Sequence, residues 1–125
     1  MNQYLFSEPR KTDALKGGIV RCYYNEVVSE VPEEITNPEN NETTTQTRTE
    51  YAYNAVDIPA PVTKGALVDA ILRAGTPETP GYSQADVEAI FRHKIAKSEG
   101  SAAEFTAFNN FAEWCKAEAT RILSE

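Results

Sequence analysis

TTTQTRTEYAYNAVDI, residues 43–58, decides the fold, because it is a strand whose two ends differ in character. Strand side chains alternate between two faces, so Thr43, Thr45, Thr47, Thr49, Tyr51 and Tyr53 fall on one face. The other face carries Thr44, Gln46, Arg48 and Glu50. The first half of the strand is therefore polar on both faces and cannot contribute much to a hydrophobic core.

A second strand precedes this one, and the two form a long hairpin. IVRCYYNEVVSEV, residues 19–31, is rich in β-branched and aromatic residues, and NPENN, residues 37–41, is typical of a turn. We expect one face of the earlier strand to carry Val20, Cys22, Tyr24 and Val28, and the other to carry Ile19, Tyr23 and Val27. The hairpin base should pack, whereas the polar tip should project and either be loosely ordered or be completed by a partner.

The rest of the chain extends this hairpin into an α+β fold. Residues 4–6 predict a short strand, residues 8–16 are polar and turn-like, and the prolines in residues 59–61 end the hairpin. We predict an antiparallel two- or three-stranded sheet with a long hairpin arm in residues 1–60. A three-helix module follows in residues 61–125, and the two modules should pack as one unit.

Each predicted helix begins at a residue that is favourable at an N-cap position. These residues are Thr63, Ser83 and Ser101. Gly75 and Gly100 should end the first two helices, and Ser101 with Glu104 three residues later predicts a capping box for the third. Apolar residues recur at helical spacing in all three, and the second helix has its stripe at Val87, Ile90, Phe91 and Ile95.

Length and charge narrow the class of protein. A chain of 125 residues suits one domain, and a net charge of −7 argues against binding to nucleic-acid phosphates. No apolar run approaches the ~20 residues that span a bilayer, so we expect no membrane contact. The N-terminus does not resemble a secretion signal, which predicts synthesis in the cytoplasm, and a component of a virion would look the same.

Few residues in the chain are suited to catalysis or metal binding. His93 is the single histidine and lies near a helix end, where a solvent-exposed role is expected. Cys22 and Cys115 fall on apolar faces and are expected to be small buried hydrophobic residues. We therefore predict no catalytic, cofactor-binding or metal-binding residues, and a protein that is not an enzyme.

Seven residues are candidates for contact with a partner. They are Tyr23, Tyr51 and Tyr53 at the hairpin base, Thr45 and Thr47 near its tip, and Trp114 and Arg121 on the last helix. Aromatic residues are enriched at recognition surfaces, but they are also ordinary strand residues. Trp114 lies off the phenylalanine face of its helix, where either the hairpin base or a separate chain packs, and Arg121 is placed to stack on the indole.

The C-terminal helices carry a resemblance to a group of known proteins. Residues 82–90 (YSQADVEAI), Phe108, Phe111 and residues 114–119 (WCKAEA) resemble the helical part of small proteins encoded in tail regions of prophages of gut anaerobes. The resemblance covers the last third of the chain and implies a structural or assembly role in a phage.

Two functions remain open on these grounds. The first is a non-enzymatic interaction protein, a minor phage or prophage tail-region component, with a protein partner or a second copy of the chain as its contact. The alternative is a small acidic regulatory or inhibitory protein that binds a basic partner through the hairpin arm. The arm carries seven glutamates with only Arg48 opposing them: Glu26, Glu30, Glu33, Glu34, Glu39, Glu42 and Glu50.

Overall fold

A sheet of antiparallel strands and a set of helices make up the chain. The computed structural model describes residues 3–124. The strands are β1 (Tyr4–Phe6), β2 (Thr12–Ala14), β3 (Ile19–Thr36) and β4 (Thr43–Pro59), and the helices are α1 (Lys64–Ala74), α2 (Gln84–Ala96) and α3 (Ser101–Leu123). The predicted α+β class, the long hairpin and the helices after residue 61 are confirmed.

The sheet has four strands, in the order β1-β4-β3-β2, so the predicted two or three strands were too few. The missed strand is β2, which lies in the segment 8–16 that was expected to be a turn. Its backbone pairs with β3 from Thr12↔Cys22 to Ala14↔Val20. A short edge strand is held by its hydrogen-bond ladder and presents polar side chains to solvent, so its sequence lacks an apolar alternation.

A β-bulge in β3 changes which side chains share a face. Tyr24 pairs with Asn54, but the next paired residue of β3 is Val27, opposite Ala52. Asn25 adopts a left-handed conformation with φ 59°, which asparagine tolerates better than most residues. The additional residue moves Val27 to the face of Tyr24 and Val28 to the opposite face. The predicted grouping of Val28 with Tyr24 was therefore wrong.

The hydrophobic core lies between one face of the sheet and the helices α1 and α3. The sheet contributes Cys22, Tyr24 and Ile58, α1 contributes Leu67 and Ile71, and α3 contributes Phe111, Cys115, Ala119 and Ile122. Tyr24 is completely buried, and its hydroxyl donates a hydrogen bond to the carbonyl oxygen of Gly75 at 2.5 Å. One core thus joins the strands before residue 60 to the helices after it.

A second aromatic cluster covers the other face of the hairpin base. The rings of Tyr4, Phe6, Tyr23 and Tyr53 lie edge-on or tilted, with centroids 5.1–6.0 Å apart. The Tyr53 hydroxyl donates to Glu26 at 2.6 Å and accepts the backbone N–H of Arg10 at 3.0 Å. Because β1 and β2 lie at the two edges of the sheet, these contacts hold the segment that joins them across this face.

Helix capping follows the sequence for two helices and departs from it for the third. Thr63 caps α1, Gly75 ends it, and Ser83 forms a capping box with Asp86 at the start of α2. However, α2 ends at Lys97 rather than at Gly100, and α3 has Gly100 as its N-cap without a side-chain bond. The predicted Ser101–Glu104 box was wrong, because Ser101 already lies inside the helix and Glu104 lies beside His93 at 3.2 Å.

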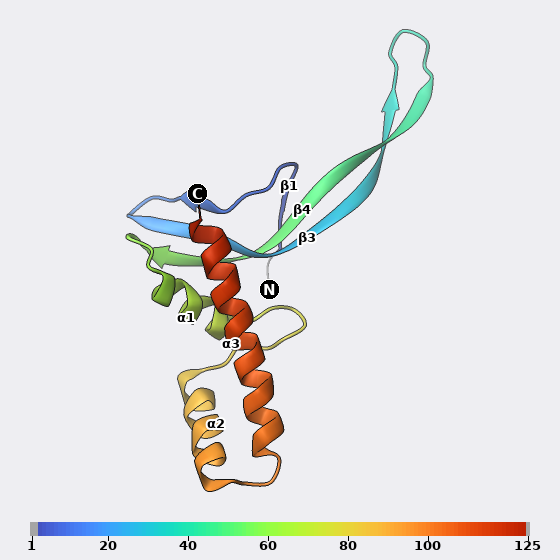
Figure 1. Cartoon of the computed structure of the whole chain (residues 1–125). Coiled ribbons are helices and arrows are strands. Elements are labelled where there is room, and N and C mark those ends of the chain that lie inside the picture. Colours follow the sequence, from blue (N-terminus) through green and yellow to red (C-terminus); the bar gives the residue numbers. More distant parts are fainter. Residues whose placement is uncertain (1–2, 125) are drawn as a thin grey trace.

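The molecule extends in two directions from its core (Figure 1). The helices α2 and α3 run antiparallel and project to one side, as the short connection between them predicts. The distal half of the β3–β4 hairpin projects to the other side, beyond every helix and beyond β1 and β2. We call residues 27–50 of this hairpin the arm.

Candidate interaction surfaces

The arm exposes both of its faces. Within residues 27–50, Val31, Thr49 and Glu50 are half-buried and the other residues are exposed. Register places Thr43, Thr45, Thr47 and Thr49 on one face, beside Thr36, Glu34, Pro32 and Glu30 of β3. We call this the threonine face. The side chains of Thr45 and Thr47 are therefore accessible, as the sequence predicted from their position near the tip.

Backbone groups are also accessible along one edge of the arm. The backbone N–H of Asn37 donates to the carbonyl oxygen of Glu42 at 2.8 Å, and the backbone N–H of Ala60 donates to the carbonyl oxygen of Gly18 at 2.7 Å. Hydrogen-bonded pairs alternate along an antiparallel ladder, so these two pairs assign the even-numbered residues of β4 to bonds with β3. The odd-numbered residues direct their N–H and C=O groups to the outer edge of β4.

Part of that outer edge is already paired, and part of it is open. Tyr51 and Tyr53 lie opposite Phe6 and Tyr4 of β1. From Thr49 back to Thr43, none of the strands described in residues 3–124 pairs with β4 on this side. An open edge of this kind is a template for another strand.

The tyrosines at the hairpin base are not part of an exposed surface. Tyr23 is 3% exposed and Tyr53 is 1% exposed, while Tyr51 is half-buried. Burial and a 2.6 Å hydrogen bond from its hydroxyl to Asp13 raise the pKa of Tyr23 to about 12. The structural role considered for these tyrosines accounts for Tyr23 and Tyr53.

Trp114 packs against Phe111 of its own helix and against the hairpin base. Its ring stacks on Phe111 with centroids 5.5 Å apart and meets the edge of Tyr24 at 6.4 Å. The hairpin base is therefore what covers this side of α3, which was one of the two alternatives. A half-buried indole still leaves part of its ring accessible beside a groove.

Arg121 is held by partners other than the indole. Its guanidinium donates to Glu118 at 3.0 Å and to the carbonyl oxygen of Tyr23 at 3.1 Å. Glu118 also accepts the backbone N–H of Asn25 at 2.6 Å. This set of bonds fastens α3 to the β-bulge, at the point where the arm leaves the core.

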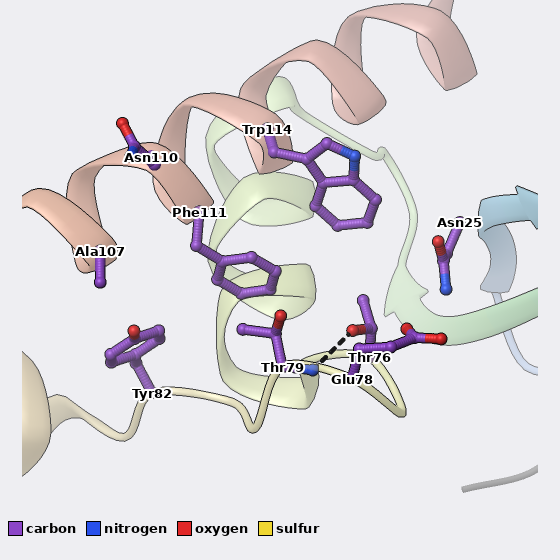
Figure 2. Close-up of a pocket in the computed structure, with 9 residues that line it drawn as sticks. All are labelled: Asn25, Thr76, Glu78, Thr79, Tyr82, Ala107, Asn110, Phe111 and Trp114. Atoms are coloured by element: carbon purple, nitrogen blue, oxygen red, sulfur yellow. Dashed lines mark hydrogen bonds between the residues drawn. The ribbon is translucent and has the colours of Figure 1, made fainter.

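A groove runs between α3 and the loop that joins α1 to α2 (Figure 2). It has a volume of about 480 Å³, and its lining residues are Asn25, Thr76, Glu78, Thr79, Tyr82, Ala107, Asn110, Phe111 and Trp114. Figure 2 shows the rings of Tyr82, Phe111 and Trp114 along its length, and the Thr79 backbone N–H donates a hydrogen bond to the Thr76 hydroxyl at 3.0 Å within the loop. Glu78 is the one carboxylate among the lining residues, so the groove lacks the paired titratable groups of a hydrolytic site.

The described residues offer little else for chemistry. Within residues 3–124, no three His, Cys, Asp or Glu side chains lie close enough to hold a metal ion, and each buried side-chain N or O atom has a hydrogen-bond partner. Cys22 and Cys115 are buried free thiols, and burial raises the pKa of Cys115 to about 11. No helix in this part of the chain is long and apolar enough to cross a membrane.

α2 carries an exposed apolar strip, although the helical spacing of these residues predicts that they pack inside the protein. Val87, Phe91 and Ile95 line an open depression of about 500 Å³, and Ile95 is 82% exposed. Ile90 is buried, and the ring of Phe91 touches Phe105 and Phe108 of α3 on one side. Helical spacing identifies the residues of the strip. It does not reveal that α3 covers only part of them, because this depends on how the two helices pack.

Comparisons with protein-family models, with curated proteins and with solved structures found no match for this chain.

Proposed function

We propose that this chain is a non-enzymatic interaction protein, a minor structural or assembly component of a phage or prophage tail region, whose arm is completed by a protein partner. The observation that carries the proposal is the arm itself. A paired ribbon with two exposed faces and an open edge contributes little to folding, yet ordering its residues costs conformational entropy. A partner that covers the ribbon offsets that cost.

The phage part of the proposal rests on the resemblance carried by α2 and α3. Under this proposal the chain is synthesised in the cytoplasm and becomes part of the particle, where copies of neighbouring proteins cover its surfaces. A tail component needs contact surfaces in more than one direction, and the arm and the α2–α3 pair project to opposite sides of the core.

A second function is favoured by the charge of the arm. Residues 27–50 contain six glutamates, at positions 30, 33, 34, 39, 42 and 50, and one basic residue, Arg48. An exposed surface of one sign raises the rate at which an oppositely charged protein associates. A small acidic protein that inhibits or regulates a basic partner would use the same arm.

The experiment that tests the first proposal is induction of the prophage in a strain that carries this gene. We expect mass spectrometry to find the protein in purified particles or in tail assembly intermediates. A variant in which residues 32–47 are replaced by Asn-Gly should remain folded but fail to enter the particles. Absence of the wild-type protein from every particle fraction would contradict a tail-region role.

Salt dependence separates the two functions. Attraction between an acidic arm and a basic partner is screened over about 8 Å at physiological ionic strength and over about 3 Å at 1 M salt. A regulatory complex that is held by charge alone should dissociate as salt is raised, whereas a tail component that neighbouring proteins also cover on its other surfaces should remain attached.

A further inference from the structure

We infer that the arm binds its partner by strand addition, and that the added strand is an extended basic segment that pairs with the outer edge of β4 from Thr43 to Thr49. This inference rests on the proposed function, because it names the mode of contact and the chemistry of the partner for the same arm.

The backbone of β4 is arranged for such pairing. Thr43, Thr45, Thr47 and Thr49 direct their N–H and C=O groups outward, by the alternation that the Asn37–Glu42 and Gly18–Ala60 bonds establish. The same edge already accepts a strand farther along, where β1 pairs with Tyr51 and Tyr53. A strand added at the threonines would continue this pairing where β1 turns away.

The opposite edge of the arm is unsuited to the same contact. Pro32 lies opposite Thr47 in the ladder, so its ring nitrogen faces the outer edge of β3 and has no hydrogen to donate. Proline and charge are the usual means by which an edge strand avoids pairing. The outer edge of β4 has no proline between residues 43 and 49, and its residues are mostly β-branched threonines that favour extended backbone.

The chemistry of the added strand follows from the threonine face. Glu30 and Glu34 lie on this face, opposite Thr49 and Thr45. The hydroxyl of Thr49 donates to Glu30 at 3.1 Å, so this carboxylate leans over β4 toward its open edge. Neighbouring strands lie about 4.8 Å apart, and a lysine or arginine on an added strand can cross the short threonines to reach these carboxylates.

The register of the glutamates predicts the spacing of the basic residues. Glu30 and Glu34 are four residues apart and on one face, so lysines or arginines at positions i and i+4 of the added strand would meet both. A second copy of this chain fits less well, because each arm carries six glutamates against one arginine and two arms would repel each other.

A synthetic peptide, Lys-Val-Thr-Thr-Lys-Val-Thr-Thr, tests the inference with the full-length protein and a fluorescence anisotropy measurement. We expect it to bind, and the peptide with glutamate in place of lysine to bind at least tenfold more weakly. Proline at positions 45 and 47 removes two outward N–H groups without touching the β3–β4 ladder. The Thr45→Pro/Thr47→Pro variant should bind the lysine peptide roughly tenfold more weakly, which corresponds to about 1.4 kcal/mol.

The matched control is Thr45→Val/Thr47→Val, which keeps the N–H groups and the β-branched shape and should bind as wild type does. A second probe avoids any change to the protein: the lysine peptide methylated on the backbone nitrogens that face β4 keeps its charge but loses its donors. It should bind wild type at least tenfold more weakly than the unmethylated peptide.

Each alternative outcome overturns the inference in a different way. Binding that is insensitive to both the prolines and the methylation would mean contact by charge alone, and no binding at low salt would mean a partner of other chemistry. A dimer of the wild-type chain that the proline variant abolishes would make a second copy the occupant. None of these results bears on the tail-region role, which is tested separately by the presence of the protein in particles.

Discussion

The base and the tip of the β3–β4 hairpin share the same two strands and one ladder, yet they are held in different ways. At the base, Cys22, Tyr24 and Ile58 lie under helices, and Tyr23 and Tyr53 are buried against the rings of N-terminal aromatic residues. At the tip, both faces meet solvent. Backbone hydrogen bonds are present in both parts, so burial of side chains is what distinguishes them.

The difference teaches where the stability of this hairpin comes from. A backbone hydrogen bond exchanges one made with water and contributes only about 1 kcal/mol net, whereas a buried aromatic side chain contributes several. The base therefore belongs to the folding unit. The tip is an extension that the base supports, and its sequence is free to serve a contact.

The largest effect should come from the base. Replacing Tyr24 with alanine removes a completely buried ring that touches Trp114 and bonds to Gly75, and we expect it to lower the free energy of unfolding by about 3–5 kcal/mol. Thr45→Ala is the matched change at the tip and should lower it by less than about 0.5 kcal/mol. Urea unfolding followed by circular dichroism measures both. Equal losses would show that base and tip do not differ.

The next effect tests the bonds at the boundary between base and arm. Glu118→Ala leaves the Asn25 N–H and the Arg121 guanidinium without their acceptor, and we expect a loss of about 1.5–3 kcal/mol. Glu113→Ala removes an exposed ion pair with Lys116 on the same helix and should cost less than about 1 kcal/mol. If the two variants unfold at the same urea concentration, the bulge is not fastened by α3.

Alkaline pH should weaken the base selectively. Burial raises the pKa of Tyr24 from 10.0 to about 12. Between these values the unfolded chain has lost the proton and the folded chain retains it, so the stability due to Tyr24 is complete below pH 10 and decreases as pH rises toward 12. Its share of the slope is about 1.4 kcal/mol per pH unit. We expect the free energy of unfolding, measured from pH 9 to 11.5, to fall less steeply with pH in Tyr24→Phe, and above pH 10 the slope should differ by this amount. An unchanged slope would contradict the assignment to Tyr24.

The smallest effect should come from removing the tip. The Val31↔Arg48 pair is a hydrogen-bonded one, so replacing residues 32–47 with Asn-Gly closes the hairpin with a turn that suits it. We expect the melting temperature to change by no more than a few degrees, because little apolar surface is removed. Unfolding of the shortened protein at ordinary temperature would mean that the tip packs against the rest of the monomer.

The sequence predicted those elements that depend on neighbouring residues. Thr63 and Ser83 cap their helices because a hydroxyl can reach an N–H three residues ahead, and this geometry is local. The polar alternation of residues 43–50 likewise identified the arm, because nothing in the described chain comes to cover it. The exposure of Thr45 and Thr47 was predicted in this way, and their contact with a partner stays a prediction.

Other features of the surface depend on segments far apart in the chain. The part of the outer edge of β4 that stays open depends on where β1 stops. The exposure of Ile95 depends on how far α3 extends over α2. The tyrosines illustrate the same point, because their place in the sequence suits both a core and a recognition surface. Tyr23 and Tyr53 became core residues when the N-terminal segment folded over them.

By itself, the sequence determined the α+β class, the hairpin with its polar tip, and the three helices. The spacing of apolar residues and the capping of helices depend only on residues that are close together in the chain. Only the tertiary structure decided the fourth strand, the bulge at Asn25 and the faces that follow it. In this bulge Asn25 adopts a left-handed conformation, and its N–H is accepted by Glu118. That partner is on a helix more than ninety residues later in the chain, where no local pattern can reveal it.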